Sequence, residues 1–203
     1  MIAIVDYGVG NLFSLSCSLR ALGLESTVTG SEAELRRADR IILPGVGAFG
    51  DAIAKLEATG LVPVLREEAE KKPLLGICLG MQLLFERSYE YGEHTGLSLV
   101  SGQVVGLHEA LEDKRLKVPH MGWNSLQIQK NDPLFRYVED GEYVYYVHSF
   151  YAKDCWESTL GTSQYGNVAV TGVVRQGNVY GTQFHPEKSG DTGLRMLRAF
   201  AEL

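Results

Sequence analysis

Short apolar runs alternate with amphipathic segments through the first half of the chain. The runs are Ile2–Tyr7, Arg40–Leu43 and Leu74–Cys78, each rich in β-branched or leucine side chains. Between them, residues 12–22 and 51–58 place apolar side chains at helical spacing. Strands that alternate with helices in this way form a parallel sheet covered by helices on both faces. We therefore predict an α/β fold with an open, mostly parallel sheet.

Local signals predict where several of these elements begin and end. Ser31 followed by Glu34 has the spacing of a capping box, which would open a short helix. Pro44-Gly45 is expected to stop the second strand, and Thr59-Gly60 to end the helix before it. The strand that ends at Cys78 is predicted to run directly into a helix over Leu79–Arg87.

The second half of the chain is richer in β-forming residues. Its predicted strands are Gly102–Leu107, Tyr143–Tyr151, Asn167–Arg175 and Val179–His185, with a hairpin turn at residues 175–178 and a closing helix over Gly193–Glu202. These strands would add antiparallel members to a mixed sheet. No repeat, low-complexity tract or linker interrupts the pattern, so residues 1–203 are predicted to form a single domain.

Composition and charge exclude several classes of function. An apolar fraction of 45% and a charged fraction of 22% are ordinary for a globular protein. The net charge of −6, with no Lys/Arg run longer than a pair, argues against nucleic acid as a partner. The apolar stretches are too short to span a membrane, and the N-terminus does not read as a signal peptide. Three cysteines favour a reducing cytoplasm over a disulfide framework.

Cys78 is the strongest candidate nucleophile. A strand that turns directly into a helix exposes the turn residue at the carboxyl edge of the sheet, where open α/β folds bind ligands. The flanking Gly76 and Gly80 permit such a tight turn. A helix N-terminus favours a thiolate, and its free N–H groups can stabilise an oxyanion. The alternative is a structural cysteine that ends a core strand, which is how we interpret Cys17 and Cys155.

His185 and Glu187 are the candidate base and its orienting acid. Pro186 biases His185 toward an extended backbone, and in an extended segment side chains i and i+2 lie on one face. The carboxylate could then orient the imidazole, which is the arrangement of a catalytic triad with Cys in place of Ser. Taken alone, a His-Pro turn beside a solvated Glu would be the favoured interpretation. The remaining histidines lack metal-ligand spacing, so no metal site is predicted.

Residues 76–82 (GICLGMQ), together with His185-Pro186-Glu187, resemble the signature of the class I, or triad, glutamine amidotransferases. The resemblance implies the fold of that family and a reaction that needs no cofactor. It implies that Cys78 attacks the carboxamide of L-glutamine to form a γ-glutamyl thioester. His185 would be the general acid and base, and Glu187 its partner.

The same resemblance assigns the surroundings of the triad. Residues 44–47 (PGVG) take the place of the family's oxyanion loop, although as a bare motif they would be only a turn. The implied oxyanion donors are the backbone N–H groups of Gly45, Val46 and Leu79. The residues implied to bind glutamine are Gln82, Gly47, His148, Ser149 and Phe150.

Four further stretches resemble the branch of this family whose glutaminase docks on a cyclase subunit. They are residues 6–11 (DYGVGN), 119–124 (PHMGWN), 145–151 (YYVHSFY) and 185–189 (HPEKS). The resemblance implies a heterodimer in which ammonia passes through the (β/α)8 barrel of the cyclase. The residues implied to line or face this junction are Asn11, Pro119, Met121, Trp123 and Lys188. Residues 95–102 depart from the pattern, which has Gly and Pro where this chain has Ser98 and Ser101.

Each interface residue also has a structural interpretation. Asn11 could cap the first helix, Trp123 could be a core aromatic, and Lys188 could be a solvated lysine. In an extended segment Lys188 would point away from the triad and toward a partner. Met121 and Trp123 would share one face of an extended segment, where they could form an apolar contact.

Three alternative functions remain open from the sequence. The chain could be the glutaminase of another class I enzyme, for example one serving anthranilate or pyridoxal phosphate synthesis, although PHMGWN and HPEKS argue against this. It could be a cysteine hydrolase of another substrate class, which Gln82 and the His-Pro-Glu sequence disfavour. It could also be a binding module in which Cys78 is only structural.

Overall fold

The computed structural model describes residues 1–203 and confirms the predicted α/β class. Its main sheet has eight strands in the order β2-β1-β3-β4-β14-β13-β12-β9. The strands span Ser26–Thr29 (β2), Ile2–Val5 (β1), Arg40–Gly45 (β3), Leu74–Cys78 (β4), Val179–Thr182 (β14), Val168–Gln176 (β13), Thr159–Tyr165 (β12) and Gln127–Ile128 (β9). The strands from β2 to β14 pair in parallel, and the remaining pairs are antiparallel.

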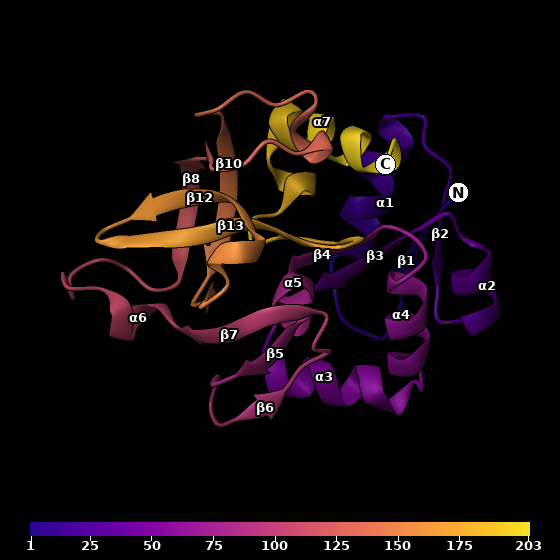
Figure 1. Ribbon diagram of the computed structural model, residues 1–203, viewed down its shortest axis with the longest axis horizontal. Helices are drawn as coiled ribbons and strands as arrows, with labels where there is room; N and C mark the ends of the chain where they lie inside the picture. The colour runs from indigo at the N-terminus through magenta and orange to yellow at the C-terminus, as the bar shows by residue number, and fades with distance from the viewer.

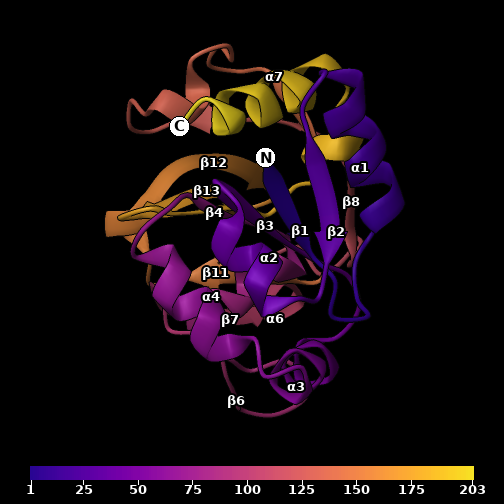
Figure 2. The ribbon, with the colours of Figure 1, turned by 90° about the vertical axis from the view of Figure 1, so that its right-hand side faces the viewer.

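Helices cover both faces of this sheet. One face carries α1 (Leu12–Ala21) and α7 (Gly190–Ala201), and the other carries α3 (Phe49–Ala58), α4 (Val62–Ala69) and α5 (Leu79–Leu83) (Figures 1 and 2). Successive β1 side chains alternate between two cores, because Ile4 packs with the α1 and α7 residues and Val5 with those of α3 and α4. The short helix α2 (Glu32–Arg37) lies beside α4. The parallel strands β1, β3, β4 and β14 are therefore buried on both sides, whereas the edge strand β2 is only partly buried.

Two smaller sheets flank the main one. One pairs β10 (Tyr143–His148) with β8 (His120–Ser125), and the other has the order β11-β7-β5-β6, formed by Phe150–Lys153, Val100–Gly106, Phe85–Ser88 and His94–Thr95. The prediction of one strand over residues 143–151 is therefore wrong. The run divides at Ser149 because its first half pairs with β8 and its second half with β7. The short helix α6 spans Leu107–Ala110.

The predicted helix over residues 79–87 is also wrong in length, since α5 ends at Leu83. The carbonyl oxygens of Leu83 and Leu84 accept hydrogen bonds from the N–H groups of Leu97 and Leu99, both at 2.8 Å. Those tertiary hydrogen bonds replace the next helical turn. Phe85 consequently enters β5, which pairs with β7.

Other local predictions have mixed outcomes. The hairpin at residues 175–178 and the helix stop at Thr59-Gly60 are confirmed. Ser31 does occupy the N-cap of α2, but its side chain makes no capping hydrogen bond, so the capping box is not formed. Strand β3 continues through Pro44-Gly45 instead of stopping there, because these residues pair with Ile77 and Cys78 of β4.

The ends of the last strand and helix differ from the prediction. Strand β14 ends at Thr182 rather than at residue 185, and α7 begins at Gly190, before the predicted start. Between them lies the 3₁₀ helix η3 (Pro186–Lys188). Ser98, where the resemblance predicts glycine, has a φ of +54°, a backbone conformation that glycine adopts more readily.

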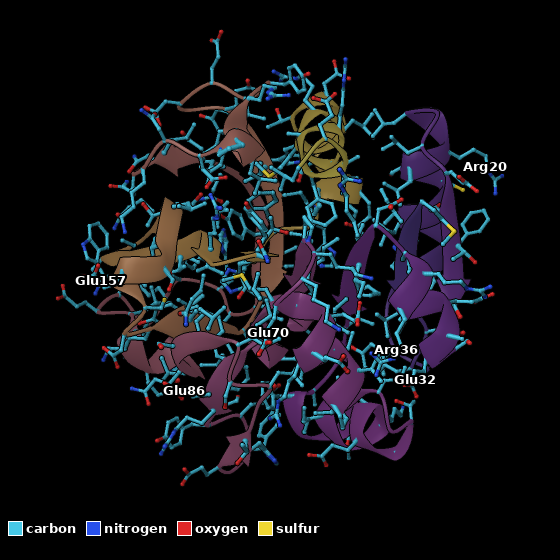
Figure 3. All side chains as sticks on the ribbon, turned by 45° about the vertical axis from the view of Figure 1, so that its right-hand side comes forward. Arg20, Glu32, Arg36, Glu70, Glu86 and Glu157 are labelled. Atoms are coloured by element: carbon cyan, nitrogen blue, oxygen red, sulfur yellow. The ribbon has the colours of Figure 1, made fainter.

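Charged side chains of both signs are interspersed on the surface, among them the exposed residues labelled in Figure 3. Arg36, for example, pairs with Glu32 one helical turn away at 2.9 Å. No helix has the length and apolar character needed to cross a bilayer. No group of three His, Cys, Asp or Glu side chains is arranged to hold a metal ion.

Candidate active site

Cys78 occupies a strained turn between β4 and α5. Its φ of +54° and ψ of −112° are rarely adopted by a residue with a side chain. The turn is tight enough that a Cβ on Gly80 would lie 1.9 Å from the carbonyl oxygen of Leu43, so only glycine fits there. The predicted tight turn from strand to helix is therefore present, and it places the Cys78 thiol at the carboxyl edge of the parallel sheet.

His185 and Glu187 form the expected pair, but not through the expected backbone. The ring Nδ1 of His185 lies 2.8 Å from Oε1 of Glu187, and both side chains are 3% exposed. Because a carboxylate only accepts, Nδ1 carries a proton and Nε2 is the atom left for chemistry. His185 itself is extended, as predicted, with φ −96° and ψ 100°. Residues 186–188 form the 3₁₀ helix η3, so the predicted extended alternation does not continue to Glu187. The side chains meet because that turn brings Glu187 back toward the imidazole.

The surroundings of His185 favour its protonated form. Burial by itself lowers the pKa of the imidazole, but the Cys78 sulfur and the Glu187 carboxylate more than offset this and raise it to about 9. His185 can therefore carry a proton at neutral pH while it lies beside Cys78. An imidazolium next to a nucleophilic sulfur suits both attack and proton donation to a leaving group.

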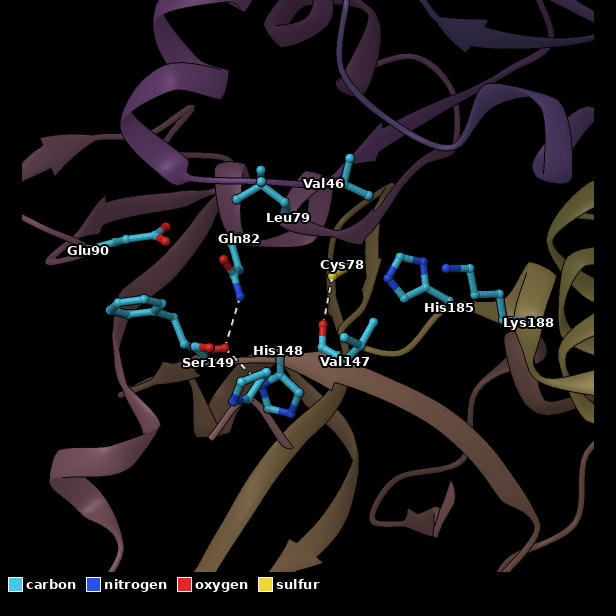
Figure 4. Close-up of a pocket in the computed structure, with 13 residues that line it drawn as sticks. Val46, Cys78, Leu79, Gln82, Glu90, Val147, His148, Ser149, His185 and Lys188 are labelled. Atoms are coloured by element: carbon cyan, nitrogen blue, oxygen red, sulfur yellow. Dashed lines mark hydrogen bonds between the residues drawn. The ribbon is translucent and has the colours of Figure 1, made fainter. Parts of the chain in front are cut away.

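A cavity of about 360 Å³ opens above Cys78 (Figure 4). It is lined by Val46, Gly47, Cys78, Leu79, Gln82, Glu90, Pro119, Val147, His148, Ser149, Phe150, His185 and Lys188. The structure thus brings together all five residues predicted to bind glutamine with two members of the triad. Five predicted site residues do not line the cavity: Gly45, Glu187, Asn11, Met121 and Trp123.

Gln82 is fixed by two hydrogen bonds that leave one of its atoms free. Its Nε2 donates to the carbonyl oxygen of Phe150 at 2.9 Å (Figure 4). The same nitrogen donates to Oε1 of Gln183 at 3.0 Å. Gln183 in turn directs its own amide nitrogen at the Cys78 sulfur, 3.8 Å away. Since both N–H bonds of Gln82 are used, its Oε1 is the atom available to accept from a ligand.

The oxyanion segment has a fixed beginning and an exposed end. Gly45 packs against α5 so closely that a Cβ would lie 2.5 Å from the backbone nitrogen of Gly80. Val46 and Gly47 are exposed, and Gly47 has a φ of +96°. Of the three predicted donors, Val46 and Leu79 line the cavity. Gly45 does not, because it pairs with Cys78 in the sheet and lies against Leu79.

His148 is a buried, neutral wall of the cavity. Burial lowers its pKa to about 3. Its Nδ1 donates to the carbonyl oxygen of Phe150 at 2.9 Å, and its Nε2 lies 3.0 Å from Nδ1 of His120. These bonds join β8, β10 and β11, so His148 holds the cavity wall in place and does not exchange protons near pH 7.

Comparison with known proteins places this geometry in a family. The family model for glutamine amidotransferase class-I matches residues 3–202. The chain belongs to the class I glutamine amidotransferases. It is 50% identical over 201 residues to the imidazole glycerol phosphate synthase subunit HisH of Bacillus cytotoxicus, which covers 98% of this chain and 93% of that protein. It is 51% identical to the HisH subunit of Bacillus cereus strain AH187 over the same shares of both chains.

Solved structures agree on the fold. A crystal structure titled glutamine amidotransferase superposes with a TM-score of 0.76 at 20% identity, covering 100% of this chain and 98% of the other. The PurLQS structure from Thermotoga maritima gives a TM-score of 0.76 at 20% identity, covering 99% and 97%. These likenesses confirm the predicted arrangement of a mostly parallel sheet with antiparallel additions.

Two residues of this amidotransferase site were not predicted from the sequence. Glu90 is 7% exposed, lines the cavity, and accepts a hydrogen bond from the N–H of Phe49 at 2.7 Å. Burial raises the pKa of its carboxyl. Gln183 directly follows the last residue of β14, is fully buried, and directs its amide nitrogen at the Cys78 sulfur. Only the position of Gln183 two residues before His185 could have drawn attention to it.

The predicted interface residues of the amidotransferase fall into three groups: the exposed Met121 and Trp123, Asn11 at the start of α1, and the cavity-lining Pro119 and Lys188. Met121 and Trp123 are 62% and 52% exposed on β8, so Trp123 is not a core aromatic. Asn11 caps α1, because its side chain accepts from the N–H of Ser14 at 3.4 Å. Lys188 does not point away from the triad as predicted. It lines the cavity beside His185, because the 3₁₀ turn rotates it to that side (Figure 4).

Proposed function

We propose that this chain is the glutaminase subunit of an imidazole glycerol phosphate synthase and acts in histidine biosynthesis. It would hydrolyse L-glutamine and deliver the ammonia to a cyclase that makes imidazole glycerol phosphate and aminoimidazole carboxamide ribotide. The observation that carries the chemistry is that Cys78 and the Glu187-oriented His185 meet at one cavity. The choice of pathway is supported by the 50% identity to HisH subunits over nearly the whole chain.

The binding groups suit a zwitterionic amino acid. L-Glutamine carries an ammonium group that needs acceptors once it leaves water. Oε1 of Gln82 and the Glu90 carboxylate both line the cavity and can accept from that ammonium. The carboxamide then reaches Cys78 at the other end. We propose Gln82, Gly47, His148, Ser149 and Phe150, together with Glu90, as the glutamine site.

The catalytic steps follow from the positions of the triad. The Cys78 sulfur attacks the carboxamide carbon, and the resulting oxyanion is stabilised by the N–H groups proposed at Val46 and Leu79, which line the cavity. Nε2 of His185 then gives its proton to the departing nitrogen. The nitrogen leaves as ammonia, and the glutamyl carbonyl remains bound to Cys78 as a thioester. His185 next removes a proton from water, and the hydroxide displaces Cys78 to release glutamate. Glu187 keeps Nδ1 protonated and stabilises the imidazolium throughout.

The proposed partner is a cyclase subunit with a (β/α)8 barrel, bound as a heterodimer. Exposed apolar side chains at Met121 and Trp123 support a docking surface there. Asn11, Pro119 and Lys188 are proposed to complete it. All three cysteines are free, which suits the cytoplasmic location that we also propose. Residues 1–203 are proposed to work as one amidotransferase domain.

Replacing Cys78 tests the division of labour between the two subunits. In the reconstituted complex, Cys78→Ser should abolish formation of imidazole glycerol phosphate from glutamine. It should leave formation from ammonium salts intact, because the thiol acts only in releasing ammonia. Cys17→Ser is the matched control, since Cys17 lies in α1 and not in the cavity. Equal loss of both activities in an assembled complex would contradict the proposal, as would turnover of peptides in place of glutamine.

A further inference from the structure

The hydroxyl of Tyr7 makes a buried hydrogen bond to the backbone of the oxyanion segment. Tyr7 is 4% exposed, and its Oη donates to the carbonyl oxygen of Pro44 at 2.8 Å. Burial and the nearby Cys78 sulfur raise the pKa of this phenol, so it stays protonated and remains a donor. The catalytic steps above do not use Tyr7.

This hydrogen bond lies where β3 is no longer paired with β1. The pairing between β1 and β3 ends at Ile4 and Ile42, whereas the pairing between β3 and β4 continues to Gly45 and Cys78. Beyond residue 42, β3 therefore has no backbone neighbour from β1. The Tyr7 side chain supplies a hydrogen bond at this point. Gly10, three residues after Tyr7, also packs against Pro44, because a Cβ on Gly10 would lie 3.0 Å from the proline ring.

Fixing the carbonyl of Pro44 also fixes the whole peptide that leads into Gly45, whose N–H faces β4. The peptide unit is planar and trans, so the C=O of Pro44 and the N–H of Gly45 point in opposite directions within one plane. A rotation that moved one would move the other. Gly45 also packs closely against Gly80, because a Cβ on Gly45 would lie 2.5 Å from the Gly80 backbone nitrogen. The exposed Val46 and Gly47 have no such restraint.

We propose that Tyr7 is a positioning residue of the glutaminase reaction. Its hydroxyl holds the Pro44–Gly45 peptide as the fixed base from which Val46, which lines the cavity, presents its backbone N–H to the oxyanion. Any rearrangement of the oxyanion segment is then confined to Val46 and Gly47. This inference rests on the proposed glutaminase function and deepens it. It concerns the stabilisation of the oxyanion and not the reactivity of the sulfur.

Tyr7→Phe removes one oxygen atom and tests the assignment in the assembled complex. Outright loss of an oxyanion donor costs roughly 10²–10³-fold in kcat, so loss of a support for one should cost about tenfold. The KM for glutamine should change little, because the cavity wall is untouched. Alkylation of Cys78 by iodoacetamide should proceed at the wild-type rate, since that displacement forms no oxyanion.

Tyr146→Phe is the matched control. Tyr146 is also fully buried, and its hydroxyl donates to Oγ of Ser163 at 2.8 Å, away from Pro44. Both variants should lower the melting temperature by a similar few degrees, because each loses one buried hydrogen bond. Only Tyr7→Phe should lower kcat selectively.

Three results would overturn the inference. One is an unchanged kcat in Tyr7→Phe, and another is an equal loss in both variants, which would reflect stability alone. The third is a fall in the alkylation rate that parallels kcat, which would place the effect on Cys78 itself. A wild-type complex without glutaminase activity would overturn the proposed function and this inference with it, whereas an active wild type beside an unaffected Tyr7→Phe overturns this inference alone.

Discussion

Exchanging Glu187 for glutamine removes a charge from the site with almost no change of shape. Oε1 of Glu187 accepts from Nδ1 of His185 at 2.8 Å, whereas Oε2 is buried and has no partner. In Glu187→Gln the amide oxygen can still accept from His185. The new NH₂ group replaces the unpartnered oxygen and finds no acceptor there. The ring therefore keeps its orientation while the imidazolium loses its counter-charge.

The size of the effect follows from the hydrogen bond that changes. A hydrogen bond to a charged group contributes about 1.5–3 kcal/mol, against about 0.5–1.5 kcal/mol for a neutral one. The difference of roughly 1–2 kcal/mol corresponds to about one pKa unit. The pKa of His185, which is about 9 in the wild type, should thus fall by about that amount. The buried NH₂ group should also lower the free energy of unfolding by about 1–3 kcal/mol.

The pH dependence of kcat/KM for glutamine, measured with the partner bound, is the direct assay. In the proposed mechanism the departing nitrogen takes its proton from the His185 imidazolium, so the activity should decline as pH rises through the pKa of about 9. In Glu187→Gln this alkaline decline should begin about one pH unit lower. At pH 7 the variant should retain more activity than His185→Asn, which removes the proton carrier and should cost roughly 10²-fold or more.

The stability of the fold should also depend on the protonation of His185. The folded pKa of His185 lies above its ordinary value of 6.5, so its contribution to stability is complete below that pH and is lost as pH rises through about 9. Thermal melts at several pH values would detect this loss. An alkaline decline that stays in place in Glu187→Gln would refute the reasoning. So would a greater loss of activity in Glu187→Gln than in His185→Asn while both remain folded.

Three further predictions concern the partner and the backbone. Trp123→Ala and Lys188→Ala should weaken cyclase binding in calorimetric titrations while changing the melting temperature little, because both side chains are exposed; unchanged affinity with a collapsed melting temperature would end the interface proposal. The isolated chain should be a poor glutaminase until the cyclase and its nucleotide ligand bias the exposed Val46–Gly47 backbone, and equal rates for the free chain and the ligand-bound complex would contradict this. Ser98→Gly should relieve a φ of +54° and stabilise the chain by about 1 kcal/mol, or about 2–4 °C in melting temperature, and a decrease would show that the serine is not strained.

The sequence by itself determined the class of fold and the centre of the chemistry. Alternating strand and helix patterns reflect local periodicity, and the strands around Cys78 are paired as that alternation predicts. The tight turn at Cys78 could be predicted because the cysteine follows a buried strand and has a glycine two residues away on each side. His185 and Glu187 could be paired because they are two residues apart, although the turn that joins them is a 3₁₀ helix and not a strand.

Tertiary structure alone decided which distant groups complete the site. Gln82 and Gln183 are hydrogen-bonded across 101 residues of sequence, and Phe49 meets Glu90 across 41. No local pattern encodes such a contact, because it depends on how strands pair and layers pack. The same reason explains the errors. Residues 143–151 form one β-rich run in the sequence, yet they divide between two sheets, since the two halves meet different partners. Lys188 turned toward the cavity because the backbone after Pro186 follows a 3₁₀ turn, and side-chain direction follows the backbone.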